Sequence, residues 1–160
     1  MQRSKVSVMA TESVVLIRNE GTVRILTLNR PDRLNAFNDE LYAAMTACLV
    51  AARADASVHV VVLTGAGRAS SSGADRSPGG RIRRDRFETF VDALSIDKPL
   101  IAAVNGVAVG IGVTLLPHCD LVLVDASARL RVPFTALGVA PEAGSSYLLS
   151  NMMGMQDAAR

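Results

Sequence analysis

The segment from Lys98 to Asp120, KPLIAAVNGVAVGIGVTLLPHCD, most constrains what this chain can fold into. Its first part, Leu100 to Val104, is apolar and typical of a buried strand, and Asn105-Gly106 predicts a tight turn. Beyond that turn, small residues at positions 108, 110 and 112 predict the opening of a helix whose backbone a ligand can approach closely. Because the first N–H groups of a helix have no partners within it, this place can hold negative charge.

Length and composition predict one globular domain over residues 1–160. A hydrophobic fraction of 49% with 20% charged residues is sufficient for a packed core. The net charge of +2 is too close to neutral to indicate nucleic acid as a partner. Cys48 and Cys119 form no CxxC pair, so we interpret them as reduced thiols of a cytoplasmic protein.

The ends of the chain carry no targeting signal that we can identify. Residues 1–12 lack the apolar core of a secretory signal and are expected to be flexible, and the last residues are not a peroxisomal tripeptide. No apolar run reaches the roughly 18 to 20 residues that span a bilayer. We therefore expect no membrane span and a cytoplasmic location.

The hydrophobic pattern predicts an α/β fold. We expect strands at residues 13–18, 22–29, 58–64, 100–104, 120–125 and 128–132. We expect helices from an Asn38 cap to about Ala54, over 81–94, and from about Gly144. The segment 65–80 is rich in Gly, Ser and Ala and is predicted to be a loop. The two continuous runs, 58–64 and 120–125, are typical of strands buried in a parallel sheet, which requires right-handed crossovers.

Four segments carry a family resemblance. They are RPDRLNAFN (30–38), GAGRASSSGAD (65–75), KPLIAAVNGVAVGIG (98–112) and LGVAPEAGSS (137–146). In this order they resemble the successive motifs of the crotonase superfamily, also called the enoyl-CoA hydratase/isomerase family. The resemblance implies repeated ββα units with stacked sheets, acyl-CoA thioesters as substrates, and homo-oligomers that are trimers or hexamers.

The resemblance also implies an oxyanion hole made of two backbone N–H groups. Carried over by motif, these belong to Ala74, after Gly73, and to Ile111, between Gly110 and Gly112. Removal of a proton beside a thioester carbonyl produces an enolate, and two N–H groups aimed at its oxygen can lower the barrier by about 2–4 kcal/mol each.

The acid–base residue separates the possible chemistries. The two glutamates of the family's hydratases fall here on Thr114 and Phe134, neither of which does acid–base work near neutral pH. Glu142 matches the catalytic glutamate of the enoyl-CoA isomerase branch, and one carboxylate can take a proton from the α carbon and return it to the γ carbon. Read from the residues alone, Glu142 could instead be a favourable charge near a helix start.

Substrate contacts follow from the same motifs. The resemblance implies that the residues holding the substrate or its coenzyme A part are Leu34, Asn35, Ala36, Ser72, Gly73, Asp75, Gly110 and Leu137. Asp75 could instead cap a helical turn. The arginines at 76, 81, 83, 84 and 86 could meet the phosphates of coenzyme A or form a solvated helix face.

Other chemistry-bearing residues have simpler interpretations. We interpret His59 and His118 as structural, and no His, Cys and acid spacing resembles a metal site. We expect no metal and no redox cofactor, with coenzyme A present only as part of the substrate.

Relative to the family pattern, the C-terminal helical region is missing, so the sequence is truncated with respect to the family. If these 160 residues are the entire product, we expect apolar surface to be left uncovered. Three functions remain open. The first is enoyl-CoA isomerisation from β,γ to α,β. The second is a catalytically inactive relative that binds acyl-CoA or acts as an interaction protein. The third is hydratase or another crotonase chemistry, such as thioester hydrolysis.

Overall fold

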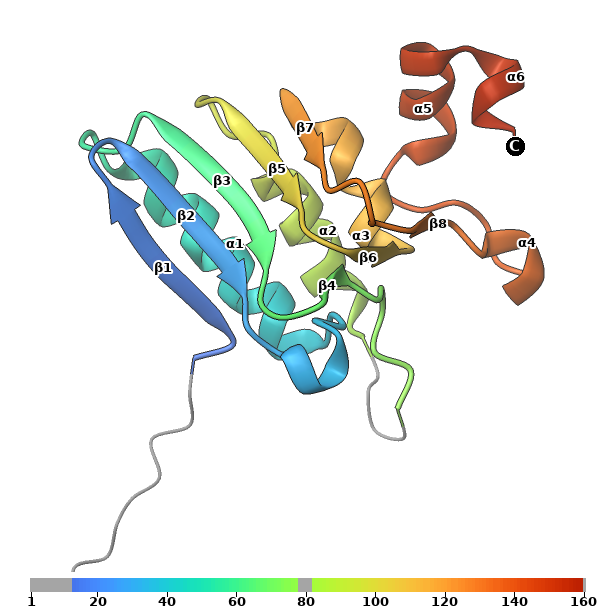
Figure 1. Ribbon diagram of the computed structural model, residues 1–160, viewed down its shortest axis with the longest axis horizontal. Helices are drawn as coiled ribbons and strands as arrows, with labels where there is room; N and C mark the ends of the chain where they lie inside the picture. The colour runs from blue at the N-terminus through green and yellow to red at the C-terminus, as the bar shows by residue number, and fades with distance from the viewer. Residues whose placement is uncertain (1–12, 78–81, 160) are drawn as a thin grey trace, which may run out of the picture.

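A five-stranded sheet forms the centre of the computed structural model, which describes residues 13–77 and 82–159 (Figure 1). Its strands lie in the order β1 (Val15–Glu20), β2 (Val23–Leu28), β3 (Val60–Gly65), β5 (Leu100–Val104) and β7 (Leu121–Val124). The hairpin β1–β2 is antiparallel, as predicted, and the other neighbours are parallel. The second sheet is parallel and contains β4 (Ala69–Ser71), β6 (Val107–Val109) and β8 (Leu130–Arg131).

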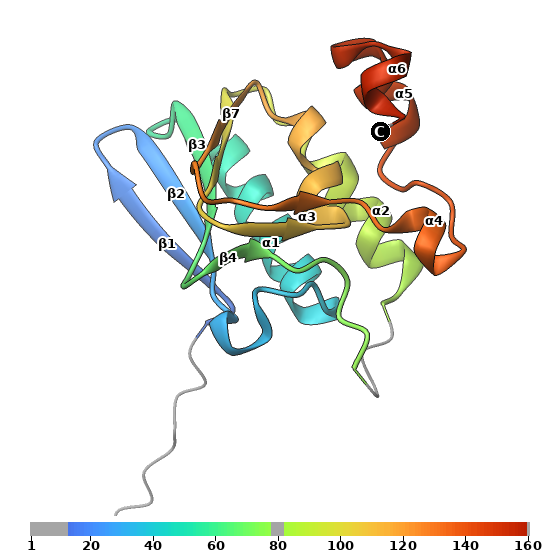
Figure 2. The same ribbon diagram turned by 45° about the vertical axis from the view of Figure 1, so that its right-hand side comes forward.

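The described helices are mostly short. They are η1 (Pro31–Arg33), α1 (Asp39–Ala54), α2 (Arg84–Ala93), α3 (Ile111–Thr114), η2 (Leu116–His118), α4 (Phe134–Leu137), α5 (Ser145–Met153) and α6 (Met155–Ala158). The strands β3, β5 and β7 of the large sheet each lead into a strand of the small sheet and then into a helix, which gives the units β3–β4–α2, β5–β6–α3 and β7–β8–α4. Figure 2 shows the small sheet across the end of the large one, with α4 beyond it. The predicted α/β fold of repeated ββα units with stacked sheets is therefore confirmed.

The longest helix, α1, forms for reasons visible in the sequence. The side chain of Asn38 caps it by accepting a hydrogen bond from the amide of Leu41, and two acids occupy its first turn. Its apolar side chains at 41, 42, 45, 49 and 52 are buried. Together with α2 it covers one face of the large sheet (Figure 1), and Phe37, Tyr42 and Phe90 form an aromatic cluster between them.

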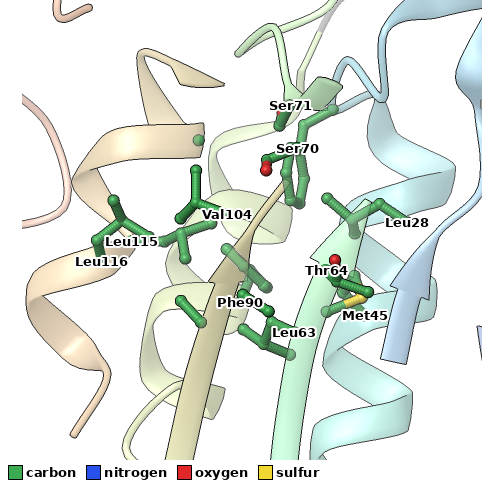
Figure 3. A pocket seen from close by; sticks show the side chains of 14 residues that line it. Leu28, Met45, Leu63, Thr64, Ser70, Ser71, Phe90, Val104, Leu115 and Leu116 are labelled. Atoms are coloured by element: carbon green, nitrogen blue, oxygen red, sulfur yellow. The ribbon is translucent and has the colours of Figure 1, made fainter. Parts of the chain in front are cut away.

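A small apolar cavity lies inside this core (Figure 3). Its volume is about 30 Å³, and Leu63, Phe90 and Leu115 are among the apolar side chains around it, with Ser70 and Ser71 at one end. This space holds about one water-sized molecule, so it is a packing gap of the core and is too small for an acyl-CoA substrate.

Two predicted boundaries are wrong in an informative way. The segment predicted as a loop, 65–80, contains the strand β4, because parallel pairing with β6 organises a run of alanine and serine that has no apolar alternation. The glycine-rich segment does not begin a helix directly after the Asn105-Gly106 turn. It first forms β6, and α3 then ends after four residues, where Pro117 follows in η2.

The prediction that 120–125 is a buried strand is also wrong in part. This segment forms β7, but it occupies the edge of the large sheet, where Leu121, Leu123 and Val124 are about half exposed. An edge strand has a neighbour on only one side, so burial on both faces does not follow from apolar composition alone. The short helix α4 was not predicted. The expected flexibility of residues 1–12 and the helical state of Arg81 lie outside the described residues.

Candidate active site

A cleft of about 380 Å³ opens where the ends of the three ββα units meet. It is lined by Ser72, Gly73, Ala74, Arg76, Val109, Gly110, Pro133, Phe134, Leu137, Val139, Ala140 and Glu142. Three of the four motifs that carry the family resemblance contribute to this lining. The first motif, residues 30–38, does not line the cleft but is bonded to its lining, since the amide of Phe37 donates to the carbonyl oxygen of Gly73 and the amide of Ser72 to that of Leu34.

The loop after β2 is held in an unusual backbone conformation. Leu34 and Asn35 have φ values of 49° and 54°, a left-handed region that non-glycine residues rarely occupy. The side chain of Asn35, which is fully buried, donates hydrogen bonds to the carbonyl oxygens of Ala66 (2.9 Å) and Ala69 (2.7 Å) and accepts one from the amide of Arg30 (2.8 Å). Asn35 therefore fixes the path of this loop against the strand β4.

Arg30 and Asp75 form a largely buried ion pair behind the cleft. The Nη2 of Arg30 lies 3.0 Å from Oδ2 of Asp75, and the side chains are 16% and 9% exposed. Arg30 also donates from Nη1 to the carbonyl oxygen of Ala36. Hydrogen bonds from the hydroxyl and amide of Ser77, together with Arg30, lower the pKa of Asp75 to about 2. The pair ties the first motif to the residue that directly follows Ala74.

Two glycines allow the loops of the second and third motifs to touch. Gly73 has a φ of 93°, and a Cβ atom there would lie 2.9 Å from the carbonyl oxygen of Val109. Gly110 has φ 52° and ψ −121°, the values of the first central residue of a type II′ turn, which glycine adopts most easily. Its amide donates to the carbonyl oxygen of Arg131 in β8 at 3.0 Å, so the small sheet fixes this turn.

The amides of Ala74 and Ile111 follow these two glycines. Within the ranges 13–77 and 82–159, neither N–H donates a hydrogen bond to another protein group. Ala74 lines the cleft, whereas the Ile111 residue is fully buried directly behind Gly110. Two such N–H groups, each directly after a glycine with a positive φ, have the character that an oxyanion site needs.

Glu142 is half buried and lines the cleft. Its Oε1 would lie 3.7 Å from a Cβ atom built on Gly110, which places the carboxylate beside the second glycine turn. Burial raises the pKa of the Glu142 carboxyl, and the guanidinium of Arg76 opposes this rise. Among the described residues that line the cleft, Glu142 has the only carboxyl group.

The two positions assigned to hydratase glutamates behave differently. Phe134 lines the cleft and makes its wall apolar. Thr114 is fully buried, does not line the cleft, and its hydroxyl has no hydrogen-bond partner within the described part of the chain. Neither side chain supplies a titratable group to the cleft.

The structure brings some of the predicted site residues together and keeps others outside. Those that line the cleft are Ser72, Gly73, Ala74, Gly110, Leu137 and Glu142. Those that do not line it are Leu34, Asn35, Ala36, Asp75 and Ile111. The roles of both groups remain predictions.

Sequence reasoning missed several supporting side chains. The role of Arg30 is not evident from the sequence, because a lone arginine at the end of a strand has no distinctive pattern. Asn105 was treated only as a turn residue, but its side chain bonds the backbone of Gly65 and Gly67 and the hydroxyl of Ser70. The Asn-Gly pair is the signal that could have drawn attention to it.

The described arginines of the cluster at 76–86 lie in two different surroundings. Arg76 lines the cleft, while Arg83 and Arg84 form exposed ion pairs with Asp85 and Glu88 and so belong to a solvated helix face.

His59 is exposed, and the ring of His118 contacts the backbone carbonyl oxygen of Ala143. No group of three or more His, Cys, Asp or Glu side chains in residues 13–77 and 82–159 is placed to hold a metal ion. In the same ranges, no helix has the length and apolar character needed to cross a bilayer.

This combination of repeated ββα units with stacked sheets and a cleft at their ends that carries one acid is that of a crotonase-type protein. The chain belongs to the enoyl-CoA hydratase/isomerase family, whose sequence model, described as "Enoyl-CoA hydratase/isomerase", matches residues 18–160.

Known relatives carry both isomerase and hydratase names. The chain is 38% identical over 152 residues to the 1,2-epoxyphenylacetyl-CoA isomerase of Escherichia coli K12, covering 88% of this chain and 58% of that protein. It is 38% identical over 159 residues to the enoyl-CoA delta isomerase 2 of Rattus norvegicus, covering 91% of this chain and 40% of that protein. A crystal structure of an enoyl-CoA hydratase from Mycobacterium marinum matches with a TM-score of 0.83 and 45% identity, covering 91% of this chain and 72% of that one. The chain thus spans less than two thirds of the length of the Escherichia coli and Rattus norvegicus isomerases.

Proposed function

We propose that this protein is an enoyl-CoA isomerase that moves a β,γ double bond of an acyl-CoA thioester to the α,β position. The observation that carries the proposal is that Glu142 has the only carboxyl group among the described residues that line the cleft. Addition of water in the manner of the family's hydratases uses two carboxylates, whereas a double-bond shift needs one. The isomerase names of two relatives agree with this choice.

The proposed reaction neither gains nor loses atoms. The Glu142 carboxylate takes a proton from the α carbon, and the electron pair of the broken C–H bond moves toward the thioester oxygen to form a dienolate. The amides of Ala74 and Ile111 donate hydrogen bonds to that oxygen. Glu142 then returns the proton to the γ carbon, so that the double bond lies between the α and β carbons.

The surroundings of Glu142 suit this task. Its raised pKa makes the carboxylate a stronger base toward a weakly acidic C–H group than an exposed glutamate. Phe134, Leu137 and Val139 give the cleft an apolar wall that disfavours water, which would otherwise compete for the proton.

The test follows the absorbance of the conjugated product when a 3-enoyl-CoA is added to the wild type and to Glu142→Gln. We expect the variant to lose a factor of about 10²–10⁴ in kcat, the usual contribution of a general acid–base. Glu40→Gln is a matched control, because Glu40 is an exposed glutamate on α1. Equal rates for the wild type and Glu142→Gln would remove Glu142 as the base.

Two further assays separate the competing functions. Loss of absorbance from added crotonyl-CoA would identify a hydratase. Binding of an acyl-CoA measured by calorimetry, without any turnover, would identify an inactive binding protein. The proposal includes no metal and no redox cofactor, and coenzyme A enters only as part of the substrate.

We also propose that copies of the chain associate as trimers or hexamers. Large apolar side chains stand exposed on β7 and in the C-terminal segment, among them Leu123, Tyr147 and Met155. Light scattering coupled to size-exclusion chromatography measures the mass directly, and a monomer at micromolar concentration would contradict this part of the proposal. A cytoplasmic location stays a prediction.

A further inference from the structure

His118 reaches across to the segment that carries Glu142. It lies in η2, between α3 and β7, and its Nε2 is 2.9 Å from the carbonyl oxygen of Ala143. A carbonyl oxygen only accepts hydrogen bonds, so Nε2 carries the proton in this contact. His118 is half buried and does not line the cleft, so it is not placed to exchange protons with a bound substrate.

The backbone that His118 holds is in a rare conformation. Ala143 has a φ of 53° and is buried, and Gly144 follows with a φ of 67°. Two successive left-handed residues are uncommon, and for alanine the conformation is strained, so the surrounding contacts have to maintain it. Other main-chain bonds here run from the amide of Ser145 to the carbonyl oxygen of Glu142 at 3.0 Å and from the amides of Tyr147 and Leu148 to the carbonyl oxygen of Gly144, but none of them engages the backbone of Ala143 itself. The buried hydroxyl of Ser145 has no partner within the described residues and gives no support.

The carboxylate of Glu142 has no side-chain anchor of its own. Among residues 13–77 and 82–159, no group donates a hydrogen bond to it. The titratable groups that interact with it electrostatically are Arg76 and Tyr42. Its position therefore depends on the path of the backbone through Ala143, which the His118 contact restrains.

We propose that His118 is a positioning residue that keeps Glu142 in the cleft by binding the carbonyl oxygen of Ala143. The consequence for catalysis rests on the proposed function, because it requires Glu142 to be the base. The geometric part does not, since it concerns where the carboxylate lies in the free protein. Without the contact, the turn at Ala143 can relax and Glu142 can move toward solvent.

Two amide substitutions test the contact without removing the polar side chain. In His118→Gln the side-chain nitrogen can occupy the place of Nε2 and still donate to Ala143, whereas the shorter side chain of His118→Asn does not reach. We expect kcat of His118→Gln to stay within about threefold of the wild type. A misplaced catalytic group can cost up to about 10²-fold, so we expect His118→Asn to lose about 10- to 100-fold in kcat with KM within about threefold.

A second readout does not depend on turnover. Side-chain carbon NMR of labelled glutamate follows the titration of Glu142 in the full chain. We expect its pKa to stay raised in the wild type and in His118→Gln, and to fall toward the ordinary glutamate value in His118→Asn. A role limited to packing would change the free energy of unfolding without separating the two variants in this titration. His59→Ala is the matched control, because His59 is the other histidine of the chain and is exposed.

The outcomes distinguish this inference from the proposed function. If Glu142→Gln is inactive but His118→Asn titrates and turns over like the wild type, the positioning role is overturned and the isomerase proposal stands. If the wild type shows no turnover but the Glu142 titration still shifts in His118→Asn alone, the positioning role is supported and the isomerase proposal fails. Equal effects of the Gln and Asn substitutions on the titration also overturn the inference.

Discussion

Replacement of Asp75 by Asn removes the charge from the ion pair that fastens the first motif to the second. The variant keeps the size of the side chain and can still accept from Ser77, but it leaves the Nη2 of Arg30 facing a neutral amide in a largely buried place. Loss of a hydrogen bond between charged groups costs about 1.5–3 kcal/mol. We expect a loss of about 2 kcal/mol in the free energy of unfolding, which corresponds to a fall in Tm of about 4–8 °C for a chain of this length.

Urea denaturation of the wild type and of Asp75→Asn measures this loss, and its pH dependence adds a second check. The pKa of Asp75 in the folded protein is about 2, below its ordinary value of 3.8. Because the pKa is lowered by folding, the stabilisation is fully present above about pH 4 and is lost as the pH falls through about 2. The difference between the two proteins should shrink over that interval.

The matched control is Asp97→Asn, which breaks the pair between Arg53 and an Asp97 side chain that is 79% exposed. We expect no measurable change in its denaturation midpoint, since exposed pairs are screened by water. If Asp75→Asn denatures at the same urea concentration as the wild type at pH 7, the ion pair does not secure the loop and the reasoning is refuted.

Three other predictions concern the cleft and its supports. Arg76→Ala removes the charge that opposes the raised pKa of Glu142, so the acidic limb of the pH profile of kcat/KM should move to higher pH; a shift to lower pH would contradict this. Asn105→Ala deletes five side-chain hydrogen bonds and should lower the free energy of unfolding by about 2–3 kcal/mol in urea denaturation. Gly73→Ala should abolish turnover and lower the free energy of unfolding by more than about 1 kcal/mol, because the added Cβ would meet the carbonyl oxygen of Val109. The control is Gly21→Ala: Gly21 also has a positive φ, but a Cβ there meets open space, so this variant should keep its activity.

Strong local patterns predicted the large sheet and the longest helix. The run 58–64 and the Asn38 cap each carry their signal within a few residues, so their structure follows from the segment itself. The small sheet was harder to predict. Its strand β4 has the composition of a loop and becomes a strand only because β6 pairs with it, Ala69 lying beside Val107 and Ser71 beside Ala108.

The candidate site shows the same division. The motif resemblance predicted that Gly73, Gly110 and Glu142 belong to one site, and all three line the cleft. These residues can be recognised in the sequence because a backbone with a positive φ favours glycine and because Glu142 is an isolated acid. The contact between His118 and Ala143 joins residues 25 positions apart and depends on the path of η2. Nothing local to either residue indicates it. The complete burial of Ile111 likewise could not be predicted from its motif, because it results from packing in the hydrophobic core.

The small sheet determines how a change of sequence would affect the alignment of the proposed site residues. β4 leads to Ala74, β6 leads to Gly110 and β8 leads toward Glu142, so each repeat contributes one part of the proposed reaction centre and none is sufficient alone. Their alignment rests on strands of two or three residues. An insertion of one residue in β4 or β6 would separate these groups while leaving the large sheet intact, so the fold could survive in descendants that had lost the proposed activity.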